Sequence, residues 1–328
     1  MKIRFAIVGS SWISEKFIDA LSQIPDTSVN AIYSRTQTRA DEFAKKYNIA
    51  YTFTDLEQMA KSDVFDAVYI ASPQAFHYSH ALVCMNNKKH VLCEKPFAAT
   101  INQVDEMIEC AKCNNVILME AIKNLYVPNL EIIKETLPKI GVVRTYYAQF
   151  CRPTSVYEQY KKGIIPNMFK PELANGSLVD IGVYCIAPMV RLFGEPTSLC
   201  ATGHILETGV DAEGTITFKY KNLTAVIMHS KMTVSYTNSE IRGENGTISI
   251  NKISNLNQIT LHKDGELTIL GKDENPNDLY YETVAFVELI KSQDFTLRDK
   301  RLSESRIVVK LMQEAREQIG VVYKDIDR

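Results

Sequence analysis

The sequence lacks three features that would place it in a special class of protein. Its charges are balanced, because 37 Lys and Arg residues stand against 39 Asp and Glu residues, for a net charge of −2. No apolar run reaches the length that crosses a bilayer, and the apolar run of residues 3–8 is too short for a signal peptide. We therefore expect a cytoplasmic protein with neither nucleic acid nor a membrane as a partner.

The sequence also lacks a disulfide framework. Its seven cysteines are an odd number scattered through 328 residues, which suits a reducing cytoplasm. Cys110 and Cys113 have the C-x-x-C spacing of a redox or metal site, but they lie in a helical pattern and no second pair follows. We interpret them as helix packing residues. We expect no metal site, because His, Cys and carboxylate residues do not cluster.

The first 122 residues alternate between two patterns. Short apolar, β-branched runs are typical of buried strands, and the runs between them carry apolar residues at helical spacing. This alternation predicts a doubly wound parallel sheet with helices on both faces, an α/β fold. The predicted strands are residues 3–8, 29–34, 66–72, 90–94 and 116–121, and the predicted helices are 12–24, 38–48, 77–88 and 101–115. Residues 51–62 are predicted to hold a further short strand and a helix.

The pattern changes after residue 122. Long β-rich segments, separated by turn-like residues such as 220–223 and 243–246, predict an open, largely antiparallel sheet. We therefore predict a first domain over residues 1–122 and an α+β domain over residues 123–328. The predicted strands of the second domain are 142–151, 198–206, 214–220, 224–234, 238–250, 258–263 and 266–270, and its predicted helices are 130–138, 177–194, 279–292 and 303–319.

The turn after the first strand lacks two of the glycines of a dinucleotide-binding motif. Gly9 is present, but Ser11 and Ser14 stand where G-x-G-x-x-G would place the others. Serine is small, and its hydroxyl can bond a phosphate oxygen at a helix N-terminus. The alternative is an ordinary strand–turn–helix unit. We predict a pyrophosphate turn formed by Gly9, Ser10, Ser11, Trp12 and Ile13.

The end of the second strand lacks the carboxylate that would bind the ribose 2′-hydroxyl of NAD. Ser34, Arg35 and Thr36 stand there instead, and Arg39 follows one turn later. Arginine is a bidentate phosphate ligand, so this group favours the 2′-phosphate of NADP over NAD. The alternative is that both arginines are solvated residues at the start of a helix.

Two further segments lie at strand ends, where an open α/β sheet binds its ligand. Ala71, Ser72 and Pro73 follow the fourth strand, and we place them and His77 at the cofactor, although a histidine at a helix start is more often structural than catalytic. Lys95 follows the fifth strand in "CEKPF". The positive charge of an oxidised nicotinamide nearby would disfavour the ammonium of Lys95. This would lower the pKa of Lys95 toward the range in which it can exchange a proton during the reaction.

A carboxylate and a phenol lie close together in the second half. Asp180 and Tyr184 are four residues apart in an apolar helical pattern and share one face. With Lys95 they would form a proton relay for alcohol oxidation. The alternative for Asp180 is a carboxylate that caps the backbone amides of the helix.

These motifs together resemble the glucose–fructose oxidoreductase/inositol dehydrogenase (Gfo/Idh/MocA) family over nearly the whole chain. The resemblance rests on the Gly9 turn, "SRT", "DAVYIASPQAFH", "CEKPFA", "MEAI", "GSLVDIGVY" and "LFGEP". It implies a Rossmann domain followed by a domain with an open sheet, which is the usual dimer interface of the family. "MEAI" is similar to the dihydrodiol and xylose dehydrogenase type.

The resemblance also implies roles for residues. Lys95 would bond the substrate hydroxyl, Asp180 would orient substrate or lysine, and Tyr184, where many members carry histidine, would relay the proton. Glu94 and Glu120, within the matched motifs, would lie at the cofactor. The sequence departs from the family pattern at Ser11, Leu125 and Ala187.

The function that follows is an NADP(H)-dependent oxidoreductase. It would transfer a hydride between the nicotinamide and a hydroxyl or carbonyl of a sugar, polyol or other small alcohol, as a homodimer or higher homo-oligomer. The alternative is a non-catalytic dinucleotide-binding sensor of the same family. Such a sensor should lack Lys95, Asp180 or Tyr184, and all three are present.

Overall fold

The chain forms two compact units. The computed structural model describes residues 2–272, 274–323 and 326. The first unit contains Met1–Ala121 and Asn275–Arg306, and the second contains Ile122–Glu274 and Ile307–Arg328. Residues 275–306, which the sequence analysis assigned to the second domain, therefore belong to the first unit. The sequence pattern of a late helix does not show which sheet that helix covers.

The first unit is built on a six-stranded parallel sheet with the strand order β3-β2-β1-β4-β5-β6. Most of its strands are nearly continuous apolar runs, as expected for a sheet that is covered on both faces. This is the strand order of a dinucleotide-binding fold, and it confirms the predicted α/β class. The strands are β1 (Ile3–Val8), β2 (Thr27–Tyr33), β3 (Tyr51–Phe53), β4 (Ala67–Ile70), β5 (His90–Glu94) and β6 (Leu118–Ala121).

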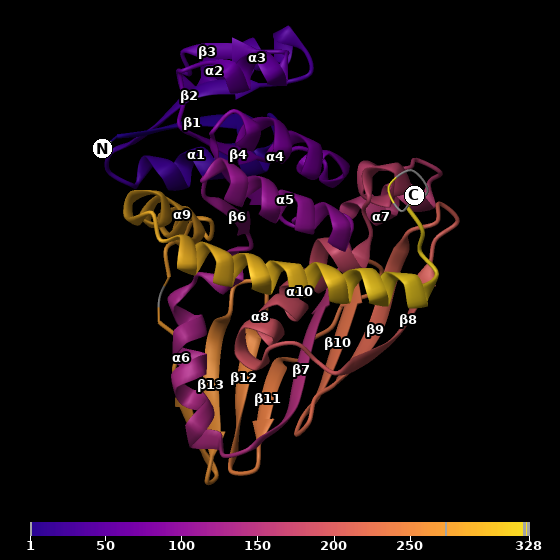
Figure 1. Ribbon diagram of the computed structural model, residues 1–328. Coiled ribbons are helices and arrows are strands. Elements are labelled where there is room, and N and C mark those ends of the chain that lie inside the picture. The colour runs from indigo at the N-terminus through magenta and orange to yellow at the C-terminus, as the bar shows by residue number, and fades with distance from the viewer. Residues whose placement is uncertain (1, 273, 324–325, 327–328) are drawn as a thin grey trace. The chain divides into compact units, whose positions relative to one another are not determined.

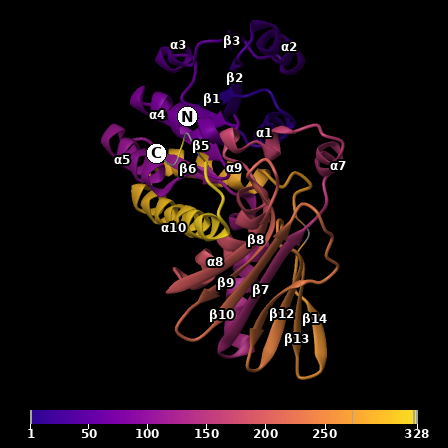
Figure 2. The same cartoon turned by 90° about the vertical axis from the view of Figure 1, so that its right-hand side faces the viewer.

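Helices cover both faces of this sheet, with α4 and α5 on one side and α1 and α9 on the other (Figure 2). Phe5 of the central strand packs against Phe17 of α1 and Phe286 of α9, with ring centroids 5.7 and 6.1 Å away. These contacts explain why α9 belongs to the first unit. The helices are α1 (Trp12–Ser22), α2 (Gln37–Tyr47), α3 (Leu56–Lys61), α4 (His77–Asn86), α5 (Ile101–Asn114) and α9 (Tyr280–Ser292).

The second unit is built on an eight-stranded sheet with the order β14-β13-β12-β11-β7-β10-β9-β8. Its neighbours are antiparallel except for β7 and β10, which are parallel. This confirms the predicted open, mostly antiparallel sheet. The strands are β7 (Val143–Cys151), β8 (Ser198–Ile205), β9 (Asp211–Lys219), β10 (Thr224–Ser230), β11 (Ser239–Gly243), β12 (Gly246–Lys252), β13 (Asn257–Lys263) and β14 (Glu266–Ile269).

Helices pack on one face of the second sheet, where α6 (Pro128–Thr136) and α8 (Val183–Phe193) lie in front of the strands in Figure 1. The long helix α10 (Phe295–Ile319) begins in the first unit and ends in the second. It begins eight residues before the predicted start. A short helix, α7 (Ser155–Lys161), and three-residue 3₁₀ turns at Asn167–Phe169 and Pro171–Leu173 form the connection after β7, which the sequence analysis left without structure.

One helical stretch meets the length and hydropathy of a membrane span, contrary to the sequence-based expectation. It covers Pro171–Phe193 with a mean hydropathy of 1.4, and 78% of its apolar window is buried inside the protein. A core helix of a folded domain has the same composition, and this stretch packs on the sheet of its own unit. The seven cysteines lie in the described residues and are free thiols.

Candidate active site

The turn after β1 requires its glycine. Gly9 has a φ of +105°, which L side chains rarely adopt, and a Cβ there would lie 2.7 Å from the carbonyl oxygen of Ala71. The Ala71 amide in turn donates to the Val8 carbonyl over 2.9 Å. The ends of β1 and β4 are therefore held too close together for a side chain. Gly9 is therefore needed for the close packing of the two strand ends.

The two serines of this turn have different roles. Ser14 is fully buried and its hydroxyl donates to the Gly9 carbonyl over 2.7 Å. It therefore stabilises the turn and is not available to a phosphate, which corrects the sequence-based expectation for this residue. The Ser11 hydroxyl is buried, does not cap α1, and has no hydrogen-bond partner among the described residues. Together with the free amides of the helix start, it suits a pyrophosphate oxygen.

The remaining residues of the predicted turn lie as follows. Ser10 is half-buried, and Trp12 begins α1 with 72% of its surface exposed. Ile13 is half-buried in the first turn of α1. The acidic residue of that turn, Glu15, is paired with Lys46 over 2.7 Å, so its charge is compensated where an anion would approach.

The end of β2 presents two arginines to solvent. Ser34 is buried, whereas Arg35, Thr36 and Arg39 are exposed at the start of α2. Neither arginine forms an ion pair with any residue that the structure describes. The Thr36 side chain does not cap the helix. Two uncompensated guanidinium groups and an open helix N-terminus suit a phosphate ester.

His77 joins two loops of the first unit. Its Nδ1 lies 2.9 Å from the Pro96 carbonyl and its Nε2 lies 2.9 Å from the Ser72 carbonyl, and the side chain is buried. Burial lowers the pKa of His77, so the ring is neutral and donates to only one of the two carbonyls at a time. Both nitrogens are committed to backbone. His77 therefore holds Ala71–Pro73 and the loop of Lys95 in place.

An aromatic group beside this loop has no counterpart in the sequence analysis. The His80 ring lies 5.7 Å from Phe76 and 6.0 Å from Tyr33, and its Nδ1 is 3.0 Å from the Ser72 hydroxyl. Burial lowers the pKa of His80 to about 4, so the ring is neutral. Phe76 remains 39% exposed. Such flat ring surfaces suit stacking against a nucleobase. In the sequence, the only sign of this group is the spacing of the aromatic residues in "FHYSH".

The backbone of Lys95 is fixed by its neighbours. Glu94 is buried, and its carboxylate accepts hydrogen bonds from the Tyr69 hydroxyl and, over 3.1 Å, from the Lys95 amide. The Lys95–Pro96 peptide bond is cis. Lys95 itself is half-buried. Glu94 therefore faces the interior of the unit and acts on Lys95 through the backbone.

Glu120 lies beneath the same loop. It is 2% exposed, and its Oε1 accepts from the Phe97 amide over 3.1 Å. Burial raises the pKa of Glu120 to about 7, and hydrogen bonds from the Ser305 side chain and the Phe97 amide oppose that shift only in part. This carboxyl contacts loop backbone, so its position supports the loop that carries Lys95.

In the second unit, Asp180 lies in a π-helical turn, Leu178–Gly182, and Tyr184 lies in the first turn of α8. Single π-helical turns are frequent at functional sites. Pro188 inside α8 cannot donate to the Tyr184 carbonyl four residues earlier. The side chain of Asn124 supplies the missing donor over 2.9 Å and also donates to Ile253 over 2.9 Å.

Asp180 is paired with a residue that the sequence analysis missed. Its Oδ2 accepts a hydrogen bond from the ammonium of Lys231, which directly follows β10. The Lys231 side chain is 1% exposed, and that of Asp180 is 29% exposed. A different carboxylate, Asp211, accepts from the amide of Leu178 over 2.6 Å. The carboxylate that caps the start of this helix is therefore Asp211 and not Asp180.

Tyr184 lies beside a second cation. The Lys123 ammonium is 5.6 Å from the centroid of its ring, and the ring of Phe150 lies 6.1 Å away. Tyr184 is half-buried. An ammonium over an aromatic ring is attracted to the face of that ring.

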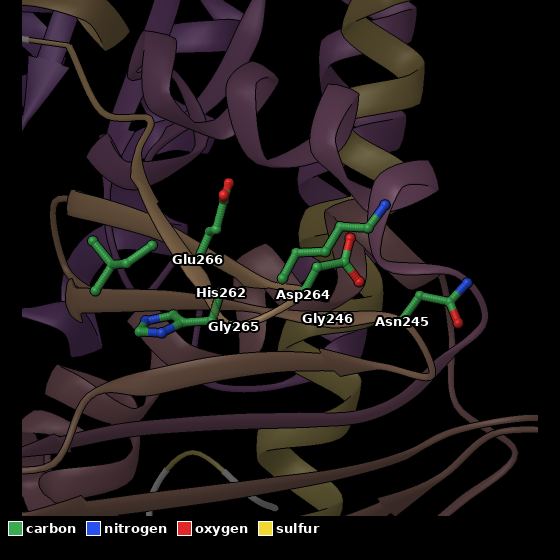
Figure 3. A pocket seen from close by; sticks show the side chains of 8 residues that line it. Asn245, Gly246, His262, Asp264, Gly265 and Glu266 are labelled. Carbon is green, nitrogen blue, oxygen red and sulfur yellow. The ribbon is translucent and has the colours of Figure 1, made fainter.

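A surface hollow elsewhere in the second unit does not have the features of a ligand site (Figure 3). It measures about 500 Å³ and lies between the turn at Asn245 and Gly246 and the turn of residues 262–267. Asp264 and Glu266 are exposed, and the side chains of His262, Glu266 and Asn245 point away from one another in Figure 3. Convergent polar groups, which mark a ligand site, are not found in this hollow.

Comparison with known proteins agrees with this description. Residues 3–122 match the model of the oxidoreductase family with an NAD-binding Rossmann fold, and residues 138–249 match the GFO/IDH/MocA C-terminal domain. The chain is 46% identical over 322 residues to the scyllo-inositol 2-dehydrogenase (NADP(+)) IolU of Bacillus subtilis, with 98% of each chain covered. It is 30% identical to the trans-1,2-dihydrobenzene-1,2-diol dehydrogenase of Mus musculus, with 98% of each covered.

Solved structures share the whole architecture. The 3-ketoreductase KijD10 of Actinomadura kijaniata, in complex with NADP and TDP-benzene, superposes with a TM-score of 0.83 at 23% identity, over 97% of this chain and 98% of that one. At this identity the likeness shows the fold alone. The sequence motifs, the two matched domains and the identity to the curated relatives establish that the chain belongs to the GFO/IDH/MocA oxidoreductase family.

Proposed function

We propose that this oxidoreductase uses NADP(H) to oxidise a ring hydroxyl of a cyclic polyol or diol, or to reduce the matching ketone. The observation that carries the proposal is the set of Lys95, Asp180 and Tyr184: an ammonium, a carboxylate and a phenol stand at the motif positions of the family. We propose that the three act in one reaction. A dinucleotide-binding sensor would not need all of them.

The residues of the first unit fit NADP. The glycine turn at Gly9, which leads into the start of α1, and the buried unpartnered hydroxyl of Ser11 suit the pyrophosphate. Ser34, Arg35, Thr36 and Arg39 would hold the 2′-phosphate, because neither arginine is neutralised by a described carboxylate. Ala71, Ser72 and Pro73 would border the cofactor, and His77, Glu94 and Glu120 would keep its surroundings in place.

The side chains of the protein would bind the substrate oxygen and move its proton. When bound, the nicotinamide accepts or supplies the hydride. Lys95 would bond the substrate oxygen at the end of β5. As a phenolate, Tyr184 would accept the hydroxyl proton during oxidation, and the phenol so formed would return it during reduction, with the Lys123 ammonium 5.6 Å from the centroid of its ring. Asp180 would accept a hydrogen bond from a neighbouring hydroxyl, which favours substrates with two adjacent hydroxyls.

The substrate class follows from this arrangement and from the relatives. A scyllo-inositol 2-dehydrogenase and dihydrodiol dehydrogenases act on rings with vicinal hydroxyls, as their names state. Inositols are therefore the first candidates, and cyclic diols the second. Leu125 and Ala187, which depart from the family pattern, are apolar and buried.

The test is turnover of the purified protein with NADP and a panel of inositols, cyclic diols and aldoses, followed by the appearance of reduced cofactor. We expect NADP-dependent oxidation of at least one inositol. Oxidation of aldoses alone would overturn the substrate class. Faster turnover with NAD than with NADP would overturn the role of the two arginines.

We further propose that the chain works in the cytoplasm as a homodimer joined through its eight-stranded sheet. Helices pack on one face of that sheet, and the other face carries Tyr147, Val226 and Met228, the last 39% exposed. Partly exposed apolar side chains on an open sheet face suit contact with a second copy. The molecular mass in solution from light scattering tests this, and a Met228→Glu variant should be monomeric where a control Tyr51→Glu variant in the first unit stays dimeric.

A further inference from the structure

A buried ammonium lies behind the carboxylate of the proposed site. Lys231 follows the last residue of β10, its amide donates to the Ala212 carbonyl over 2.9 Å, and its side chain is 1% exposed. An ammonium this deeply buried is costly unless it is paired. Its ion partner is Asp180, whose side chain remains 29% exposed. The carboxylate is therefore neutralised from inside the unit, while part of the Asp180 side chain stays exposed.

The turn that carries Asp180 is braced by the two neighbouring strands. Asp211 at the start of β9 holds the Leu178 amide, and the His229 Nδ1 on β10 lies 3.0 Å from the Ser177 hydroxyl. A Cβ on Gly176 would lie 2.1 Å from the Asp211 carboxylate, so chain and carboxylate are in close contact. The backbone of this turn is thus fixed independently of Lys231. What Lys231 adds is control of the Asp180 side chain.

The other ionisable groups nearby do not take over this task. Burial lowers the pKa of His229 to about 3, so this ring is neutral. Burial raises the pKa of Asp211 to about 6, and its hydrogen bond from Leu178 opposes that shift only in part. Among the described neighbours of the turn, the Lys231 ammonium is therefore the charge that faces Asp180 from the sheet.

We propose that Lys231 is a positioning residue for the reaction: its buried ammonium keeps Asp180 ionised and aimed at the substrate, so that Asp180 accepts a hydrogen bond and leaves proton transfer to Tyr184. The inference rests on the proposed function, because it assigns a task to Asp180 within that reaction. An ionised acceptor forms a stronger bond to a hydroxyl than a neutral one does. The neutral form carries a proton of its own and would compete with the phenol as the proton donor during reduction of the ketone.

The test compares Lys231→Met, Lys231→Arg and Lys231→Gln with a control, Lys252→Met, which removes an exposed lysine of the same unit. We expect Lys231→Met to lower kcat/KM for the polyol by about tenfold to a hundredfold, mainly through KM. Lys231→Arg should restore most of it, because arginine keeps the charge. NADPH binding should stay within about twofold in every variant. Lys231→Gln provides the measurement if the methionine variant does not fold.

A double-mutant cycle separates positioning from a merely structural role. If Lys231 acts through Asp180, Lys231→Met should cost less than about threefold in an Asp180→Asn background. An equal loss in both backgrounds, or no recovery with arginine, would overturn the proposal. The same cycle in thermal unfolding tests the pair without substrate. Coupled unfolding in a protein without polyol turnover would mean that the ion pair is real but the proposed function is wrong, and additive unfolding would reject the pair itself.

Discussion

The two units contribute different kinds of chemical groups to the proposed site. In the first unit the groups that surround Lys95 and the two arginines are largely backbone: the Gly9 turn, the Ser72 and Pro96 carbonyls bridged by His77, and the amides at the start of α1. In the second unit they are ionic side chains, above all Asp180 with the buried Lys231. Backbone groups suit a phosphate ligand that is the same in every reaction. Side-chain charges suit the proton management of one reaction.

This difference predicts that binding and turnover can be separated by mutation. Changes to the side chains that manage protons should abolish turnover and leave the dinucleotide bound. Changes at the end of β2 should weaken the dinucleotide according to its 2′ substituent. Changes beneath the Lys95 loop should appear first in the pH dependence of stability.

The largest effect is expected for Lys95→Met. We expect kcat/KM to fall by about a thousandfold or more, because the substrate oxygen loses its charged hydrogen-bond donor. The dissociation constant for NADPH, measured by fluorescence, should stay within about twofold. Lys112→Met, which removes an exposed lysine of α5 in the same unit, is the control. Normal turnover in Lys95→Met would remove this residue from the mechanism.

Tyr184→Phe should lower kcat by about a hundredfold, since the phenol hydroxyl is the proposed proton carrier. The ring and its contacts with Lys123 and Phe150 remain in this variant. Melting temperature and NADPH binding should therefore be preserved. A kcat within about threefold of the unmodified protein would assign the proton to another group.

Arg35→Ala should raise the dissociation constant for NADPH by about tenfold to a hundredfold and leave that for NADH unchanged. The reason is that Arg35 is exposed beside α2 with no described carboxylate partner. Lys45→Ala removes the same charge from the last turn of the same helix and serves as control. Equal weakening of both dinucleotides would point to a general effect of charge.

The smallest effect concerns Glu120. Folding raises its pKa from 4.5 to about 7, so its contribution to stability is complete below about pH 4.5 and is lost as the pH rises through 7. Glu120→Gln does not titrate. The melting temperature of this variant minus that of the unmodified protein should therefore increase by roughly 5 °C from pH 5 to pH 8. Parallel melting curves across this range would show that Glu120 does not titrate as its burial implies.

The same contrast explains what the sequence could reveal. Gly9, Arg35 and Lys95 follow directly after predicted strands, so local pattern placed them. Asp180 and Tyr184 were found because they are near one another in the chain. The residues that contact them, Lys231 and Asn124, were not found. Lys231 is 51 residues from Asp180, and Asn124 is 60 residues from Tyr184. No local pattern records such pairings.

Ser14 and the last helices show a second limit. A serine in a glycine position is compatible with a phosphate contact and with a bond to the turn itself, and only the packing of α1 decides for the latter. Residues 279–292 were recognised as helical, but their place against Phe5 in the first unit depends on contacts across most of the chain.

The most direct test of the account follows NADPH fluorescence in one experiment. The protein is first mixed with NADPH, and then with the ketone that oxidation of scyllo-inositol at one carbon would give. The account predicts a change in fluorescence on binding, followed by loss of the signal as the bound NADPH is oxidised, with Tyr184→Phe showing the first change and almost none of the second. Binding with no oxidation by this or any other cyclic ketone would contradict the account and identify a dinucleotide-binding protein without catalysis.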